Sequence, residues 1–222
     1  MNKQKTISTK DLVGLAMLTA IVVVLQLLGS FIRFGVFSIS LVLLPIVIGS
    51  AVYGVAAGAW LGLTFGVTVL LSGDASVFLA ISPLGTILTV LVKGVGSGLA
   101  AGLVYRGIRT LGRKADAKAE QADANKAEIA VDHWFDLYGV TAATIAAAIA
   151  APIANTGIFL IGCCLFFMEA VSGWGQAAGF ENVGTYMIVG FVGLNFLFEM
   201  LINVVLSPAV VRLLKYIRRN LR

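Results

Sequence analysis

Long apolar stretches bounded by charged residues constrain the fold of this chain more than any other feature of its sequence. The first covers residues 12–31, where no charged side chain stands between Asp11 and Arg33. About 20 mostly apolar residues are needed to cross the roughly 30 Å of hydrocarbon in a bilayer. Only 12% of the 222 residues are charged, whereas a soluble domain has about 25%. We therefore expect the chain to fold within a membrane.

The apolar stretches are continuous, which distinguishes spanning helices from the strands of a β-barrel. Barrel strands alternate apolar and polar residues over about 10 positions, and residues 12–28 show no such alternation. The sequence thus predicts an all-α, polytopic bundle of about six transmembrane helices, folded as one membrane domain over residues 1–222. The expected spans are residues 12–31, 39–52, 55–71, 82–105, 138–168 and 185–214. Pro45 interrupts the second span, so the second and third are expected to be short, tilted or kinked.

A polar segment at residues 106–136 separates the fourth span from the fifth. Its charges balance and it is rich in alanine, which favours a solvated helix or linker. Lys and Arg number three in the first tail, six in this segment and five in the last tail. Excess Lys and Arg mark cytoplasmic loops, so we expect both termini in the cytoplasm and the chain in the cytoplasmic membrane. Because basic residues at span ends explain the net charge of +5, we expect the lipid bilayer, and no nucleic acid, as their partner.

The sequence carries no catalytic or cofactor-binding signature. Cys163 and Cys164 are adjacent within an apolar run, a spacing that suits neither a metal site nor a disulfide framework. The only histidine, His133, lies in the polar segment, and neither a G-x-S-x-G nor a phosphate-binding G-x-x-x-x-G-K-[ST] sequence occurs. We therefore expect no catalytic residue, no metal and no cofactor in this chain, and we expect any ATP to be used by other subunits.

Small residues recur every fourth position in three of the expected spans. The glycines among them are Gly54, Gly58, Gly62 and Gly66 in the third span and Gly94, Gly98 and Gly102 in the fourth. Such ridges let helix backbones approach closely, either within the bundle or at a sliding interface with another subunit. In the first span Ala16 and Ala20, with Gly14 nearby, could likewise pack within the bundle or dock to a partner.

Two ionisable residues lie at membrane depth, where charge is costly and usually functional. They are Lys93 in the fourth span and Glu199 in the sixth. They could form a structural ion pair, or Lys93 could attract an anionic ligand while Glu199 accepts hydrogen bonds from a hydroxyl, amide or ammonium group. Asn195 and Asn203 flank Glu199 at four-residue spacing and share its helix face. A polar face of this kind lines either a hydrogen-bonded helix seam or a ligand cavity.

Further polar and aromatic residues are expected around this face. Asn155 and Thr156 follow Pro152 in the fifth span, and Trp174 and Tyr186 stand in or beside the third external loop. The two aromatic residues could cap a cavity that opens outward, or they could belong to the aromatic belt at the membrane surface.

Four short motifs occur in a fixed order along the chain. They are P-x-x-x-G at residues 45–49, G-x-x-x-G-x-x-x-G at 54–62, the glycine-rich stretch 93–105 that begins with Lys93-Gly94, and N-T at 155–156. In order and spacing they resemble the substrate-binding S subunits of energy-coupling factor (ECF) vitamin transporters, nearest the pantothenate-type subgroup. The resemblance covers nearly the whole chain outside the polar segment.

The resemblance implies a six-helix subunit that binds a vitamin or related micronutrient from outside, with pantothenate-like molecules as the expected ligands. It also implies association with a membrane T protein and two cytoplasmic ATPases, and reorientation in the bilayer to deliver the ligand. The family's docking motif falls on Ala16 and Ala20, beside Gly14, which favours the T-protein interface for them. The residues expected to contact ligand are Lys93, Asn155, Thr156, Asn195 and Glu199, with Arg33, Asp74 and Trp174 near the entrance.

Two other classes of function compete with this one. A self-sufficient secondary transporter or channel would need an ion-coupling route or duplicated halves, and the sequence shows no inverted repeat. A membrane scaffold protein would use Lys93 and Glu199 as a structural pair and would retain no small molecule.

Overall fold

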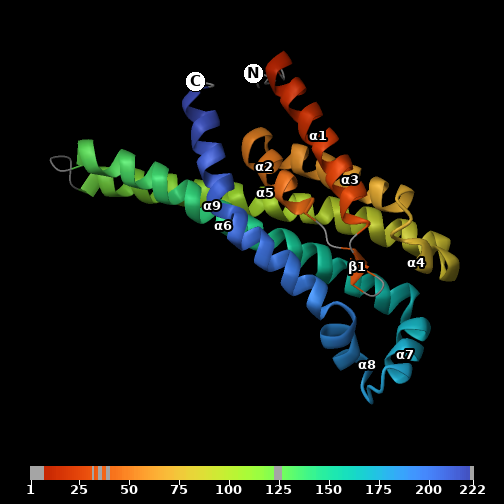
Figure 1. Ribbon diagram of the computed structural model, residues 1–222. Helices are drawn as coiled ribbons and strands as arrows, with labels where there is room; N and C mark the ends of the chain where they lie inside the picture. Colours follow the sequence, from red (N-terminus) through yellow and green to blue (C-terminus); the bar gives the residue numbers. More distant parts are fainter. Residues whose placement is uncertain (1–7, 32, 35–36, 39–40, 123–126, 221–222) are drawn as a thin grey trace, which may run out of the picture.

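The computed structural model is a bundle of α-helices, as the sequence predicts (Figure 1). It describes residues 8–31, 33–34, 37–38, 41–122 and 127–220, and the side chains of 8–31, 41–112 and 139–217. The helices are α1 (Thr9–Gly29), α2 (Leu43–Tyr53), α3 (Val55–Leu71), α4 (Ser76–Ile81), α5 (Pro83–Ala122), α6 (Ala127–Phe166), α7 (Met168–Ala177), α8 (Val183–Thr185), the π-helical segment η1 (Tyr186–Phe191) and α9 (Gly193–Asn220). Between α1 and α2, strands β1 (Arg33–Phe34) and β2 (Phe37–Ser38) form a small antiparallel pair.

In the part of the chain that the structure describes, four helices are long and apolar enough to cross a membrane: α1, α5, α6 and α9. The helices α2 and α3 are apolar but shorter, with 11 and 17 residues. At about 1.5 Å per residue, α2 is long enough for only about half of the hydrocarbon thickness. The prediction of six apolar helical segments is therefore confirmed, as is the expectation that the second and third are short.

Local sequence explains where several helices begin and end. The side chain of Ser8 accepts a hydrogen bond from the backbone N–H of Asp11, whose carboxylate accepts one in return, so a capping box begins α1. A single residue, Gly54, separates α2 from α3 and adopts a φ of 97°, a left-handed conformation that a side chain would oppose. This tight connection places α2 beside α3.

The glycine ridges of α3 and α5 face each other. A Cβ added at Gly62 would meet the backbone oxygen of Gly94, and one added at Gly94 would meet the backbone oxygen of Gly62. Gly58 and Gly98 make the same reciprocal approach one turn away. The ridges therefore pack the bundle internally, the first of the two uses that their spacing allows.

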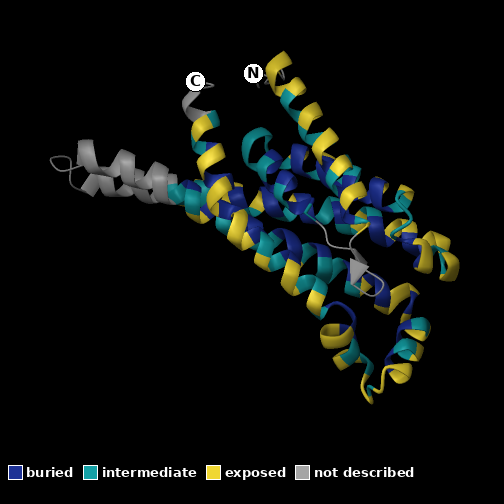
Figure 2. Ribbon diagram, in the orientation of Figure 1, coloured by how far each residue is buried: buried dark blue, intermediate teal, exposed yellow. Residues whose placement is uncertain are grey.

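The buried residues concentrate where α5 packs against α3 and α6 (Figure 2). Among the described residues, the larger of two apolar clusters joins α1, α2, α3, α5, α6 and α9, and the smaller combines aromatic and aliphatic residues of α4, α6, α7 and η1. Large apolar side chains are exposed along α1 and α9, as expected of surfaces that face lipid.

The start of α1 and the end of α9 lie at one end of the bundle, and β1, α4, α7 and α8 lie toward the other (Figure 1). The predicted external loops contain short helices that were not expected: α4, α7 and α8. The sixth spanning helix begins at Gly193, not at residue 185, because π-helical η1 precedes it. The polar segment at 106–136 is the helical continuation of α5 and α6 on either side of residues 123–126, which lie outside the description.

Candidate functional site

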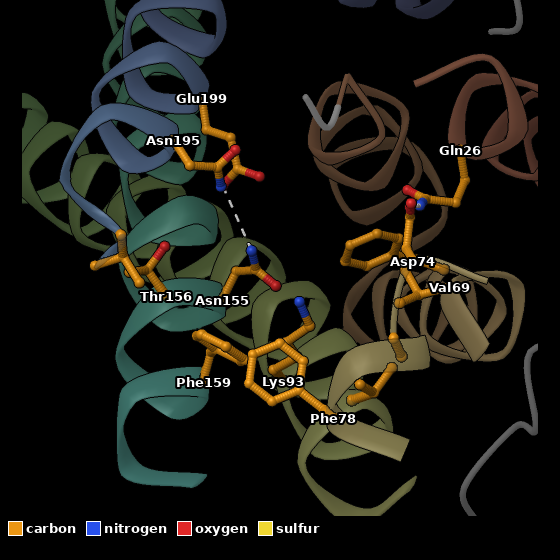
Figure 3. Close-up of a pocket in the computed structure, with 14 residues that line it drawn as sticks. Gln26, Val69, Asp74, Phe78, Lys93, Asn155, Thr156, Phe159, Asn195 and Glu199 are labelled. Carbon is orange, nitrogen blue, oxygen red and sulfur yellow. Dashed lines mark hydrogen bonds between the residues drawn. The ribbon is translucent and has the colours of Figure 1, made fainter. Parts of the chain in front are cut away.

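A polar cavity lies inside the bundle, between α1 and the α3–α4 connection on one side and α5, α6 and α9 on the other (Figure 3). Its polar lining consists of Gln26, Asp74, Lys93, Asn155, Thr156, Asn195 and Glu199. Its apolar lining consists of Phe65, Val69, Ala75, Phe78, Val90, Phe159 and Val192. The space within this lining is about 660 Å³ when the part open to solvent is included. An apolar lining with a few convergent polar groups is typical of sites that bind small molecules.

Lys93 supplies the cation of the cavity from α5. Its Nζ lies over two aromatic rings, 5.6 Å from the centroid of Phe65 and 5.2 Å from that of Phe159. The negative face of an aromatic ring attracts an ammonium group at such distances. Among the described residues, none accepts a hydrogen bond from Nζ or forms an ion pair with it, Glu199 included. The lysine therefore has capacity for an acceptor supplied from within the cavity.

Glu199 supplies a carboxylate from α9 and is 2% exposed. Asn155 of α6 donates a hydrogen bond from Nδ2 to Glu199 Oε2 at 3.4 Å, drawn as the dashed line in Figure 3. One turn away, Asn203 donates from Nδ2 to the backbone oxygen of Glu199 at 2.7 Å. The polar face predicted on the sixth span serves both of its possible roles at Glu199, which lines the cavity and accepts a hydrogen bond from α6, whereas the hydrogen bond of Asn203 stays within α9.

A second amide and carboxylate pair forms the opposite wall. Gln26 of α1 donates from Nε2 to Asp74 Oδ2 at 2.6 Å, and Gln26 is 2% exposed. Gln26 was not expected from the sequence, because the first span is apolar on average. The rule that singled out Lys93 and Glu199 could have found it, since a polar side chain at membrane depth needs a partner.

Three amide oxygens of the lining are buried without a hydrogen-bond partner among the described residues. They are Oε1 of Gln26 and Oδ1 of Asn155 and Asn195. A buried polar group without a partner costs about 1–3 kcal/mol. These oxygens therefore favour a molecule in the cavity that donates hydrogen bonds.

Aromatic rings close the end of the cavity nearest α4. Phe78 makes edge-to-face contacts with Phe159 and Trp174, whose ring centroids lie 5.5 Å and 5.9 Å away. Trp174 also packs against Phe191 of η1, at 5.7 Å. Trp174 thus lies behind the lining, in contact with a ring that forms it, and does not line the cavity itself.

Of the eight residues expected to contact ligand or to lie near the entrance, six line this cavity: Asp74, Lys93, Asn155, Thr156, Asn195 and Glu199. Trp174, expected near the entrance, does not line the cavity but contacts Phe78, which does. Arg33 lies in β1, and its side chain is outside the description. The sequence analysis does not single out Phe65, Phe78 and Phe159, because an apolar residue that lines a cavity looks the same in sequence as one that packs in the core.

The small residues of α1 separate into two groups. Ala16 and Ala20 are exposed and lie on one helix face, as a docking surface requires. Gly14 is partly buried, and a Cβ added to it would meet the side chain of Tyr53. Gly14 therefore packs against α2 within this chain, unlike the two alanines.

The chemistry of the cavity suits reversible binding. It offers one ammonium group, carboxylates, amides and aromatic faces, and a group of three or more His, Cys, Asp or Glu residues that could hold a metal ion is absent from the described part of the chain. These groups can orient a polar ligand through charge-assisted hydrogen bonds and apolar contacts.

Comparison with known proteins assigns this architecture. A family model described as "ECF transporter, substrate-specific component" matches residues 10–211. No curated protein and no solved structure matches the chain in the corresponding comparisons. The family match covers four of the six apolar helices in full and most of α1 and α9, together with every residue that lines the cavity. The chain therefore belongs to the substrate-specific components of ECF transporters, which are multi-pass membrane proteins that bind a small-molecule substrate and are not enzymes.

Proposed function

We propose that this subunit captures a vitamin or related micronutrient in the cavity between α1, α5, α6 and α9. The observation that carries the proposal is that Lys93 and Glu199 face the same cavity without forming an ion pair with each other. Two opposite charges kept apart at membrane depth are costly, and a bound polar ligand offsets that cost by contacting both. A purely structural role for the two residues would favour their direct contact.

The proposed contacts follow from the chemistry of each wall. Lys93 binds an acceptor or anionic group of the cargo, and Glu199 accepts a hydrogen bond from a hydroxyl, amide or ammonium group. Asn155, Thr156 and Asn195 complete the polar wall on that side. Pantothenate is the first compound to test, because the motifs at 45–49, 54–62 and 155–156 are nearest that subgroup.

The proposal extends to the assembly in which the subunit works. The whole chain acts as a single membrane domain in the cytoplasmic membrane, with both termini and the extensions of α5 and α6 in the cytoplasm. Ala16 and Ala20 dock to the membrane T protein, and two ATPases bound to that protein hydrolyse ATP, so this chain needs no cofactor of its own. The exposure of both alanines and the excess of Lys and Arg at the termini support this arrangement.

Native mass spectrometry of the purified chain, produced with and without a T protein and its ATPases, tests the proposal. We expect a retained molecule of vitamin size that is lost in Lys93→Ala and in Glu199→Ala, together with a complex that contains all the subunits. Leu28→Ala, a change to an exposed apolar residue of α1, serves as the matched control and should retain the ligand. A folded chain that retains no small molecule and joins no complex would favour a scaffold or a stand-alone transporter.

A further inference from the structure

Each wall of the cavity contains an amide side chain that is hydrogen-bonded to a carboxylate, and the proposed function does not use this arrangement. On each wall a carboxylate holds the N–H₂ group of an amide: Asp74 holds Gln26 at 2.6 Å, and Glu199 holds Asn155 at 3.4 Å. An amide has one donating and one accepting end, and it can rotate by half a turn to exchange them. A carboxylate accepts hydrogen bonds and cannot donate them, so it fixes which end of the amide faces it.

The fixed orientation determines what the amides can offer to a ligand. With each N–H₂ group turned to its carboxylate, the carbonyl oxygen is the end that has no partner among the described residues, both at Gln26 Oε1 and at Asn155 Oδ1. Both residues line the cavity and are buried, with 2% and 4% of their surfaces exposed. Figure 3 shows them on opposite walls, with Lys93 between them.

We infer that Gln26 and Asn155 are specificity-determining residues that select cargo bearing hydrogen-bond donors on two sides. The inference rests on the proposed function, because it assigns a selection rule to the same cavity. The cargo presents an N–H or O–H group to each carbonyl oxygen and an acceptor or anionic group to Lys93. A molecule of the same shape without those donors leaves both carbonyl oxygens buried and unpartnered, and the site rejects it.

Two kinds of scaffold satisfy this rule, and the experiment separates them. The first is a planar heterocycle with ring N–H groups, which the faces of Phe65 and Phe159 also suit. The second is a flexible aliphatic acid that carries hydroxyl and amide groups. The probes are therefore lumazine with its N,N-dimethyl analogue and pantothenate with its di-O-methyl ether, because the methyl groups of each analogue replace hydrogen-bond donors of the parent.

Binding of all four compounds to the purified full-length chain is measured by isothermal titration calorimetry. We expect one parent compound to bind, and its methylated analogue to bind about tenfold more weakly or worse. In Gln26→Met and Asn155→Leu the ratio of the two dissociation constants should fall to about threefold or less, because the carbonyl oxygen that needs a donor is gone. Size-exclusion chromatography and thermal unfolding establish that each variant is folded.

Two further variants separate selection from a structural role. Glu199→Gln keeps the shape of the side chain, but the new amide can donate hydrogen bonds as well as accept them. Asn155 is then free to rotate. The ratio of the two dissociation constants should therefore fall although the cavity stays the same size. Thr89→Val is the matched control, since Thr89 also has a buried oxygen without a partner among the described residues but does not line the cavity. In Thr89→Val the ratio of the dissociation constants of the methylated analogue and its parent should equal the ratio in the unchanged chain.

The result that would overturn the inference differs from the result that would overturn the proposed function. A parent and its methylated analogue that bind equally well would overturn the inference and leave the binding function intact. The inference would also be overturned if Thr89→Val lowered the ratio as much as Asn155→Leu does. Failure of both parent compounds to bind would also overturn the inference that the cavity selects hydrogen-bond donors. The proposed function is tested separately, by the molecule that native mass spectrometry finds retained in the chain.

Discussion

The close approach of α3 and α5 makes a strong prediction about Gly94, which lies next to Lys93 in α5. A Cβ at Gly94 would meet the backbone of Gly62, and it would lie 3.2 Å from the backbone nitrogen of Gly66. Backbone atoms cannot rotate away as the end of a side chain can. In Gly94→Ala the two helices must therefore separate, by roughly 1 Å if ordinary contact distances are to be restored.

The size of the effect follows from two opposing contributions. Alanine favours an α-helix over glycine by about 1 kcal/mol, which stabilises the variant. Overpacking costs about 1–3 kcal/mol, and the separation also weakens the neighbouring Gly58 to Gly98 contact. We expect a net loss of about 1–2 kcal/mol, which corresponds to a fall in Tm of about 2–8 °C for a chain of this size.

The matched control is Gly107→Ala on the same helix, because a Cβ at Gly107 would meet no atom within 4 Å. The assay heats each purified variant in detergent and measures the fraction that remains monodisperse on size-exclusion chromatography. Gly107→Ala should be as stable as the unchanged chain or slightly more stable. Gly94→Ala should also bind ligand more weakly, because Lys93 moves with α5 relative to Phe65 of α3. Equal Tm values for the two alanine variants would refute the reasoning from close packing.

Three further predictions address the cavity and the outer face of α1. Lys93→Met should weaken binding of the retained ligand by about tenfold or more through loss of a charge-assisted hydrogen bond, and unchanged affinity in calorimetry would contradict a ligand contact. Gln26→Met should speed amide hydrogen exchange in the loop around Asp74 by about tenfold, because the Asp74 carboxylate loses its hydrogen bond from Gln26. Equal exchange rates would show that this hydrogen bond does not stabilise the loop. Ala20→Trp should leave the Tm of the isolated chain unchanged, since Ala20 is exposed, but should reduce co-purification with the T protein, whereas Leu28→Trp on the same helix should reduce it less.

Sequence alone identified the bundle because a bilayer imposes one dominant requirement on a spanning segment. Continuous apolar length is readable without any knowledge of tertiary contacts, so all six apolar helices were found. The short helices outside the spans obey no such requirement. The start of α9 at Gly193 depends on the π-helical register of η1, which apolar composition does not encode.

The cavity was predictable to the extent that it is polar. Charged and amide side chains at membrane depth draw attention in a sequence, and this signal found Lys93, Asn155 and Glu199. Phe65 was missed because an apolar residue that faces a ligand looks the same in sequence as one that faces lipid. The position of Trp174 relative to the cavity could not be read from the sequence, because it depends on the packing of Phe78.

The two aromatic rings that contact the Lys93 ammonium affect the stability of the protein when no cargo is bound. A transport subunit has to be stable twice in each cycle, once with its cargo and once after releasing it. When the cargo leaves, the ammonium keeps its contacts with Phe65 and Phe159, which contribute about 0.5–2 kcal/mol apiece when a cation is removed from water. The rings thus lower the free-energy cost of holding the ammonium group inside the ligand-free protein. The next cargo molecule then meets a charged group that is already in position.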